Sequence, residues 1–309
     1  MKQAGVGTKF LIKLLTVLVA CLIAFGGIAK AQDEEDNTPI KVDTLLFTIP
    51  LTVSDRKGTY IAGLKKENFT IYEDGLVQEI ELFQNENAPM NVAILIDTSN
   101  STKKVLDKIQ QAARDFVKIL RPEDRAVIVG FDNRTLYLTD LVSDRKILTR
   151  AIERVDANDG SASDMYAAVL GVLQKYFATL KGRKAIIALT DGMVTGRGIK
   201  AQTVLDNLQE TDTFFYPIIF KTEANASRGG KTPVLVELLQ IIAEGTGGKF
   251  YEKDSTKLKE AFQSIAEDLK YQYLLGFYPR NANGGTTSSR IRISVDRDDL
   301  RVNTKKRLN

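Results

Sequence analysis

Histidine is absent from the 309-residue chain, and cysteine occurs once. Without histidine the chain cannot form a Ser-His or Cys-His nucleophile pair, a His-ligated zinc site or an imidazole acid/base group. The single cysteine, Cys21, lies in an N-terminal apolar segment. The rest of the chain therefore has no thiol nucleophile, no thiolate metal site and no disulfide bond.

An excess of one charge sign is also lacking once the N-terminus is set aside. The formal net charge is +4, from 43 basic and 39 acidic side chains. Residues 1–31 carry four lysines and no acidic residue, which leaves 39 of each sign in the remainder. A near-neutral chain gives no electrostatic basis for nucleic-acid binding. With 43% hydrophobic and 27% charged residues, the composition is that of a globular protein.

The first 31 residues have the pattern of an export signal. Lysines come first, the apolar stretch LLTVLVACLIAFGGIA follows, and the small residues of AKA end at Ala31. This order predicts cleavage after Ala31 and a periplasmic or extracellular mature chain. Two alternatives stay open, and both would bring contact with a membrane. The segment could remain as an anchor, although its 16 uncharged residues are short of the ~20 that span a bilayer, or LVAC could direct lipidation of Cys21.

The remainder of the chain divides into three regions. Residues 32–90 are expected to form an acidic linker, QDEEDNTP, and a β-rich module that includes NFTIYEDG and VQEIELFQ. In residues 91–270, apolar strands such as NVAILID alternate with amphipathic helices. Helices are expected in KVLDKIQQAARDFVKIL, where Ile109, Ala112 and Phe116 recur at three- to four-residue spacing, and over about 164–180 and 255–269. Residues 271–309 again have sequences typical of β-strands. We predict an α/β fold with a doubly wound, mainly parallel, Rossmann-like sheet, flanked by β-rich segments that pack together as one β module.

One glycine-rich segment invites a different interpretation. GTGGK at 245–249 resembles a phosphate-binding loop, but the first glycine of that motif would fall on Ala243 and Phe250 follows the lysine. The segment is therefore interpreted as a glycine-rich exit from a helix into a short strand.

Side-chain oxygens follow buried strands at several places in the α/β region. Ligands of an open parallel sheet bind beyond the carboxyl ends of its strands, so these segments are expected to meet there. The first segment follows NVAILID, the second is the loop NDGSASDMY, and the third ends the strand AIIALTD. Their candidate residues are Asp97, Ser99 and Ser101, then Ser161, Ser163 and Asp164, and finally Asp191, which precedes Gly192.

The oxygen set suits a hard divalent cation. Magnesium prefers six oxygen ligands and keeps several of its waters. The neutral hydroxyls of Ser99 and Ser101 would bind it directly, whereas Asp97 and Asp191 would hold bound waters and orient the hydroxyls. Each segment alone also has an ordinary explanation, because Ser, Thr and Asp after a strand often cap a helix and TDG often forms a turn. Their occurrence together favours a metal site.

This arrangement resembles the von Willebrand factor type A domain and its metal-ion-dependent adhesion site (MIDAS) over residues 91–270. The Asp-x-Ser-x-Ser motif of that family falls on Asp97, Ser99 and Ser101, and its later aspartate falls on Asp191. The family's intervening threonine corresponds to Ser163, with Ser161 as the alternative. The flanking text, including KKENFTIYEDG and YLLGFYP, resembles a bacterial secreted subgroup described from acidobacteria.

The resemblance implies a non-enzymatic adhesion module. It would bind Mg²⁺, with Mn²⁺ or Ca²⁺ as alternatives, and a protein or peptide partner that presents an Asp or Glu carboxylate. Nucleic acid and small-molecule substrates are not expected. The alternative is a metal-dependent hydrolase or phosphotransferase that uses Asp97 as nucleophile or Asp191 as base. Residue 99 is Ser where aspartate-based phosphatases carry a second Asp, which argues against it. In a third interpretation, the metal only stabilises the fold.

Overall fold

The computed structural model describes residues 46–85, 87–157, 163–192, 198–221, 234–280 and 290–305. These residues belong to one compact unit, Thr44–Asn309. The predicted export signal and acidic linker lie outside the described residues. Within the described part of the chain, no helix has the length and apolar character needed to cross a membrane.

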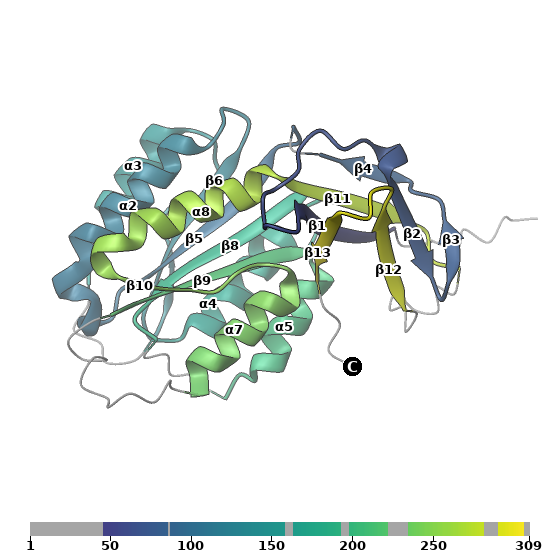
Figure 1. The fold of residues 1–309 in the computed structure, drawn as a ribbon. Helices are drawn as coiled ribbons and strands as arrows, with labels where there is room; N and C mark the ends of the chain where they lie inside the picture. The colour runs from purple at the N-terminus through teal and green to yellow at the C-terminus, as the bar shows by residue number, and fades with distance from the viewer. Residues whose placement is uncertain are drawn as a thin grey trace, which may run out of the picture. The chain divides into compact units, whose positions relative to one another are not determined.

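The α/β region contains a six-stranded sheet (Figure 1). Neighbouring strands are parallel, except that the edge strand β7 runs antiparallel to β6. In spatial order the strands are β10 (Tyr251–Asp254), β9 (Thr213–Lys221), β8 (Arg183–Thr190), β5 (Met90–Asp97), β6 (Arg125–Phe131) and β7 (Thr135–Tyr137). Every residue of β5 and β8 is buried, because helices cover both faces of the sheet. This burial explains why the sequences of the two strands are continuous apolar runs.

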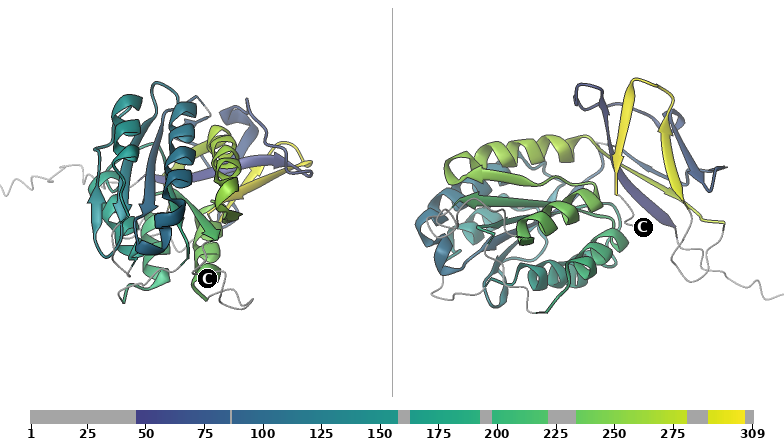
Figure 2. Two further views of the ribbon diagram at one scale, coloured as in Figure 1. Left: turned by 90° about the vertical axis from the view of Figure 1, so that its left-hand side faces the viewer. Right: turned by 60° about the horizontal axis from the view of Figure 1, so that its bottom comes forward.

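Helices lie on the two faces of this sheet, as Figure 2 shows. One face packs against α2 (Leu106–Ile119), α3 (Arg145–Glu153) and α8 (Leu258–Lys270). The other packs against α4 (Met165–Val172), α5 (Ala201–Glu210) and α7 (Val234–Thr246). Alternate residues of β5 pack into the two hydrophobic cores on opposite faces of the sheet. Ile94 belongs to the core beside α2, and Leu95 belongs to the core beside α4. The predicted doubly wound α/β fold is confirmed.

Some helix boundaries differ from the sequence prediction. The helix expected over 164–180 is α4 followed by a π-helical turn, η3 (Leu173–Phe177). Three short 3₁₀ turns also occur, namely η1 (Lys66–Asn68), η2 (Asn100–Val105) and η4 (Ser255–Lys257). The turns η2 and η4 directly precede α2 and α8, so each of these helices begins later than its apolar spacing suggested.

The β-rich flanks form one module of two sheets, as predicted. The first sheet has the order β13 (Leu300–Thr304), β1 (Phe47–Asp55), β11 (Gln272–Phe277) and β4 (Leu82–Gln84). The second has the order β12 (Ile291–Val295), β2 (Phe69–Glu73) and β3 (Leu76–Gln78). N-terminal strands pair with C-terminal ones in both sheets, and Leu51, Ile71 and Tyr273 pack in the shared core. The run VQEIELFQ is divided between β3 and β4, with buried Ile80 between them.

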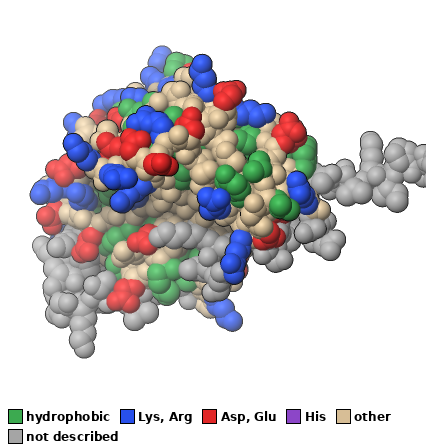
Figure 3. All heavy atoms as spheres, turned by 45° about the vertical axis from the view of Figure 1, so that its right-hand side comes forward, with side chains coloured by type: hydrophobic (Ala, Val, Ile, Leu, Met, Phe, Trp, Pro, Cys, Tyr) green, Lys and Arg blue, Asp and Glu red, His purple; other side chains and the backbone are tan. Residues whose placement is uncertain are grey.

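The surface of the molecule carries both charge signs. On the face drawn in Figure 3, basic and acidic side chains are intermixed, in keeping with the balanced composition. Hydrophobic side chains are also visible there. In the β module, the side chains of Leu76, Val77 and Tyr278 are exposed by 56%, 58% and 48%.

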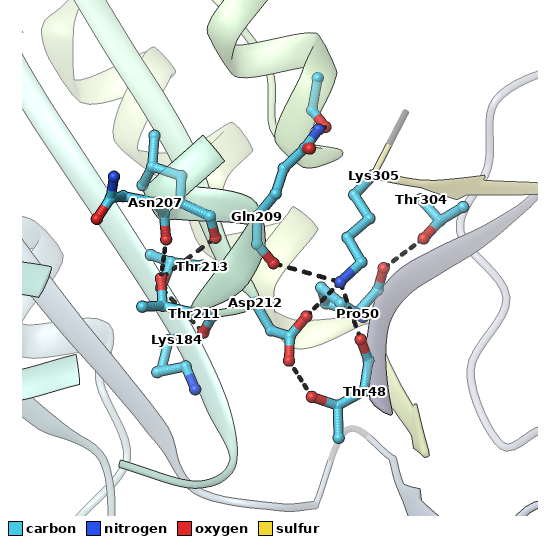
Figure 4. A network of polar contacts seen from close by, with 12 residues as sticks. Thr48, Pro50, Lys184, Asn207, Gln209, Thr211, Asp212, Thr213, Thr304 and Lys305 are labelled. Carbon is cyan, nitrogen blue, oxygen red and sulfur yellow. Dashed lines mark hydrogen bonds and ion pairs between the residues drawn. The ribbon is translucent and has the colours of Figure 1, made fainter. Parts of the chain in front are cut away.

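A buried polar network joins the β module to the α/β domain (Figure 4). Lys305 Nζ lies 2.6 Å from Asp212 Oδ1 and donates to the carbonyl oxygens of Thr48 at 3.0 Å and Gln209 at 3.3 Å. The Thr48 hydroxyl donates to the other carboxyl oxygen of Asp212. Asp212 immediately precedes β9 and has a φ of +52°. The network therefore lies at the amino end of β9, opposite the carboxyl edge where the polar segments were predicted to meet.

Candidate metal site

The carboxyl ends of three neighbouring strands bring the predicted segments to one edge of the sheet. Asp97 ends β5, Thr190 ends β8 and Phe131 ends β6. The parallel register places Asp97 level with Phe131, and it pairs Ile96 with Leu189 on the other side. After β6 the chain returns to the far side of β5, so the strand order reverses between β5 and β8. Such a reversal is the usual ligand position in open α/β sheets.

The Asp97 carboxylate connects all three predicted segments. Its Oδ1 accepts a hydrogen bond from the backbone N–H of Ser99 at 2.9 Å. Its Oδ2 accepts from Ser163 Oγ at 3.0 Å and from Thr190 Oγ1 at 2.7 Å. Asp97 has no exposed surface. One buried side chain therefore sets the relative positions of the loop after β5, the segment before α4 and the end of β8.

The loop after β5 directs two hydroxyls to the same place. Ser99 Oγ and Ser101 Oγ lie 3.1 Å apart. Thr102 stabilises the loop, because its hydroxyl donates to the carbonyl oxygens of Ser99 at 2.8 Å and Asp97 at 3.1 Å. Ser99 occupies the N-cap position of η2 but makes no side-chain capping hydrogen bond. The helix-cap alternative therefore does not account for the Ser99 hydroxyl.

The segment before α4 separates a candidate ligand from a helix cap. Ser163 is 1% exposed and donates to Asp97. Asp164 caps α4, since its carboxylate accepts from the N–H of Ala167 at 3.1 Å. Ser161, the alternative candidate, lies outside the described residues.

The segment after β8 is a tight turn that contains a buried carboxylate. Asp191 is 2% exposed. Gly192 has a φ of +78°, a conformation that favours glycine, and its N–H donates to Thr190 Oγ1 at 3.2 Å. Thr190 thus supports both the turn and Asp97. Sequence reasoning gave it no role, although its place directly before Asp191 was the available signal.

Asp132 is a further residue that sequence reasoning missed at this edge. It follows β6 and is 4% exposed. Its carbonyl oxygen accepts from the Asp164 N–H at 2.8 Å, and its Oδ1 accepts from the Arg134 N–H at 2.7 Å. The turn after β6 therefore positions the segment that carries Ser163.

Two buried carboxyl groups, Asp97 and Asp191, lie at this edge. Burial raises the pKa of Asp97 above its ordinary value, and the negative charge of Asp191 raises it further. Hydrogen bonds from Ser99 and Thr190 act in the opposite direction and stabilise the ionised form. A divalent cation at this edge would favour ionised carboxylates.

The donor set fits a hard divalent cation. The hydroxyls of Ser99, Ser101 and Ser163 and the carboxylates of Asp97 and Asp191 are all oxygen donors. The set combines neutral hydroxyls with carboxylates. The described residues include no group of three or more Asp, Glu, His or Cys side chains that could hold a metal ion. The hydroxyls are therefore an essential part of this candidate site.

Comparisons with known proteins give a family match and several similar folds. The family model for the von Willebrand factor type A domain matches residues 91–264. Proximal thread matrix protein 1 from the mussel byssus is similar with a TM-score of 0.51 at 15% identity, over 69% of this chain and 50% of that chain. Another structure of that protein, with a zinc-occupied MIDAS motif, gives a TM-score of 0.51 at 16% identity, over 63% and 48%.

A third similar structure is a domain of a pili tip protein. The vWF domain of the type V pili tip protein Mfa5 from Porphyromonas gingivalis gives a TM-score of 0.48 at 13% identity, over 59% of this chain and 95% of that chain. At these identities the likeness concerns the fold alone. The aligned part spans about half of the mussel chains. No curated protein sequence matches the chain.

Proposed function

The chain belongs to the von Willebrand factor type A domain family, and on this premise we propose that its α/β domain is a protein-binding module that depends on a divalent cation. The observation that carries the proposal is the Asp97 carboxylate, which fixes Ser99, Ser163 and Thr190 at one sheet edge. The hydroxyls of Ser99, Ser101 and Ser163 would hold the cation, and Asp97 and Asp191 would position them and bound water.

The hydrogen-bond directions support this division of roles. A hydroxyl that donates its proton to a carboxylate keeps its lone pairs for a cation. Ser163 donates to Asp97 in this way, and the Ser99 and Ser101 oxygens are close enough to contact one ion together. Mg²⁺ suits the oxygen set, with Mn²⁺ or Ca²⁺ as alternatives. A bound cation would supply an electrophilic coordination position for a ligand oxygen.

The chemistry of the site favours an acidic partner. Neutral hydroxyl ligands leave much of the cation charge uncompensated, so an Asp or Glu carboxylate of a protein or peptide would complete the coordination. Lys103 and Lys104 are exposed in η2, two and three residues after Ser101. Their positive charge would increase the association rate of an acidic partner.

The enzyme alternative gains no support from this geometry. A nucleophilic Asp97 would need access to substrate, yet its side chain is fully buried and both carboxyl oxygens accept protein hydrogen bonds. These contacts suit a positioning role. Turnover of a phosphoester panel that requires metal and is lost in Asp191→Asn would overturn this conclusion.

Peptide selection with and without metal tests the proposal. Peptides displayed on phage would be selected on the purified chain in Mg²⁺ and eluted with EDTA. We expect the selected peptides to share an Asp or Glu whose replacement by Asn or Gln abolishes binding. The matched control is the Ser99→Ala/Ser101→Ala variant, which should select no EDTA-sensitive peptides. Binding that persists in EDTA would contradict the proposal.

Export is a separate part of the proposal. The lysine-led apolar segment and the AKA sequence before Gln32 support secretion with cleavage after Ala31. N-terminal sequencing of the protein from the periplasm or the medium should begin at Gln32. A chain that retains residues 1–31 would favour the membrane-anchor alternative.

A further inference from the structure

A cluster near the end of α8 places a lysine amine on a buried aspartate carboxyl group. Lys249 Nζ lies 2.8 Å from Asp268 Oδ1. Tyr216 Oη donates to Asp268 Oδ2 at 2.7 Å. The Tyr60 hydroxyl contacts both Lys249 Nζ and Asp268 Oδ1. The candidate metal site uses none of these four side chains.

Four separate parts of the fold fix the cluster. Asp268 belongs to α8, Tyr216 to β9, Tyr60 to the segment after β1, and Lys249 to the segment before β10. The backbone beside the lysine is also constrained. Gly248 has no room for a side chain, because a Cβ there would collide with the backbone of Phe215. The glycine pair before Lys249 therefore lets the chain lie against β9 and brings the amine to Asp268.

Burial acts against the charged forms of both groups. Asp268 has no exposed surface, and burial raises the pKa of its carboxyl group to about 8. Burial also lowers the pKa of the Lys249 amine. In water an amine and a carboxylic acid exchange a proton and remain an ion pair. Burial weakens that preference, because it removes the solvation that stabilises the two charges.

We propose that Lys249 and Asp268 condense after folding to form an intramolecular amide bond. Lys249 Nζ attacks Asp268 Cγ, the Cγ–Nζ bond forms, and the Cγ–Oδ1 bond breaks. The Tyr60 hydroxyl, which contacts Nζ and Oδ1, passes the proton lost by Nζ to Oδ1, and Oδ1, which already carries the acid proton, leaves as water. Tyr216 donates to Oδ2, which becomes the amide oxygen. One amine and one carboxylic acid thus yield one amide and one water.

The fold supplies what this reaction lacks in free solution. Well-oriented intramolecular groups reach effective molarities of about 10⁵–10⁸ M, and the fold holds Lys249 Nζ 2.8 Å from Asp268 Oδ1. Asp268 is enclosed, whereas 44% of the Lys249 side-chain surface is exposed, so the released water can leave on the lysine side. The bond would tie α8 to the segment before β10, beside the Tyr60 contact from the β module. The chain cannot place a disulfide there, since its one cysteine is Cys21.

Intact-mass spectrometry of the folded full chain tests the proposal directly. With the N-terminus determined, we expect a mass lower than the sequence mass by one water. A tryptic digest should contain one branched peptide that joins Lys249 to Asp268, without cleavage after Lys249. The Lys249→Arg variant keeps the positive charge but cannot form this amide, so it should show its full sequence mass. Asp268→Asn should lose ammonia instead of water.

The Tyr60→Phe variant tests the proton transfer by the Tyr60 hydroxyl, while Lys249 and Asp268 stay in place. We expect this variant to fold and to form the cross-link more slowly in a refolding time course. A folded wild-type chain with its full sequence mass and normal cleavage after Lys249 would overturn the proposal. That outcome would leave the cation-dependent function unaffected, since the two sites share no residue. The wild-type measurement decides the matter even if a variant fails to fold.

Discussion

Thr190 Oγ1 donates a hydrogen bond to Asp97 Oδ2 at 2.7 Å and so joins the ends of the two central strands of the sheet. Both side chains are fully buried. The contact orients the Asp97 carboxylate before any cation arrives, and it places Asp191, the next residue after Thr190, at the same edge. Thr190 is therefore a positioning residue of the candidate site.

Replacing Thr190 with valine should weaken cation binding. The substitution keeps the shape of the side chain and removes one donor to a buried carboxylate. Loss of such a partner lowers metal affinity about 10–100-fold. Titration calorimetry with Mn²⁺ would measure the effect, with Thr190→Ser as the matched variant that keeps the hydroxyl. Equal affinity in Thr190→Val and wild type would show that the contact has no role in the site.

Ser163 should be the ligand of the second segment. Ser163→Ala removes both a donor to Asp97 and a candidate ligand oxygen, so the affinity for Mn²⁺ should fall at least tenfold. Ser163→Thr keeps the oxygen and should retain binding. Ser161→Ala is the control and should leave affinity unchanged. The opposite pattern, a loss in Ser161→Ala alone, would assign the ligand to Ser161.

Cation binding should weaken as the solution is made acidic. Burial raises the pKa of Asp97 in the folded protein above its ordinary value of 3.8. The metal-free folded state therefore holds this proton more tightly than the unfolded chain, and its stability falls as the pH rises from 3.8 through the raised value. The cation requires the ionised form. Its stabilising effect, measured as the rise in Tm, should shrink as the pH falls through the raised pKa, and a rise independent of pH would contradict this.

The Lys305–Asp212 pair should be important for stability. The two side chains are only 15% and 11% exposed, so Lys305→Met would leave a buried carboxylate without its cation. Breaking such a pair costs about 3–5 kcal/mol of unfolding free energy. Adding Asp212→Asn should recover much of the loss, because asparagine is neutral and tolerates the positive φ. Urea denaturation would measure both effects.

A surface ion pair provides the control for that experiment. Lys118 pairs with Asp115 at 2.9 Å, but its side chain is 70% exposed. Lys118→Met should therefore change the unfolding free energy little. A similar loss in the Lys118 and Lys305 variants would show that burial of the Asp212 pair adds nothing.

The α/β fold was predictable because its strands and helices have clear periodicity. Continuous apolar text predicted β5 and β8, and the spacing of Ile109, Ala112 and Phe116 predicted α2. Strand β13 lies in the region predicted to be β-rich, but its bounds were not predicted, because LRVNT is largely polar and its strand character comes from pairing with β1. The division of VQEIELFQ between two sheets depends on two different partners, since β3 forms a hairpin with β2 and β4 pairs with the distant β11.

The candidate site was predictable in outline only. Asp97, Ser99 and Asp191 were recognisable because each lies at or just after the end of an apolar strand. Thr190 was not, since a threonine at the end of a strand has many possible roles. Asp132 resembled an ordinary turn residue for the same reason. The contact between Tyr216 and Asp268 spans 52 residues of sequence, and only the packing of α8 on β9 brings the two together.

The cation itself allows the most direct test of the central claim. Tm would be measured for the wild type and for Ser99→Ala/Ser101→Ala, each with EDTA and with increasing Mg²⁺ or Mn²⁺. A ligand that binds only the folded state stabilises it by about 2.7 kcal/mol at one hundred times its Kd. We predict that Tm rises with cation concentration in the wild type and stays constant in the variant. The same rise in both proteins would contradict the account.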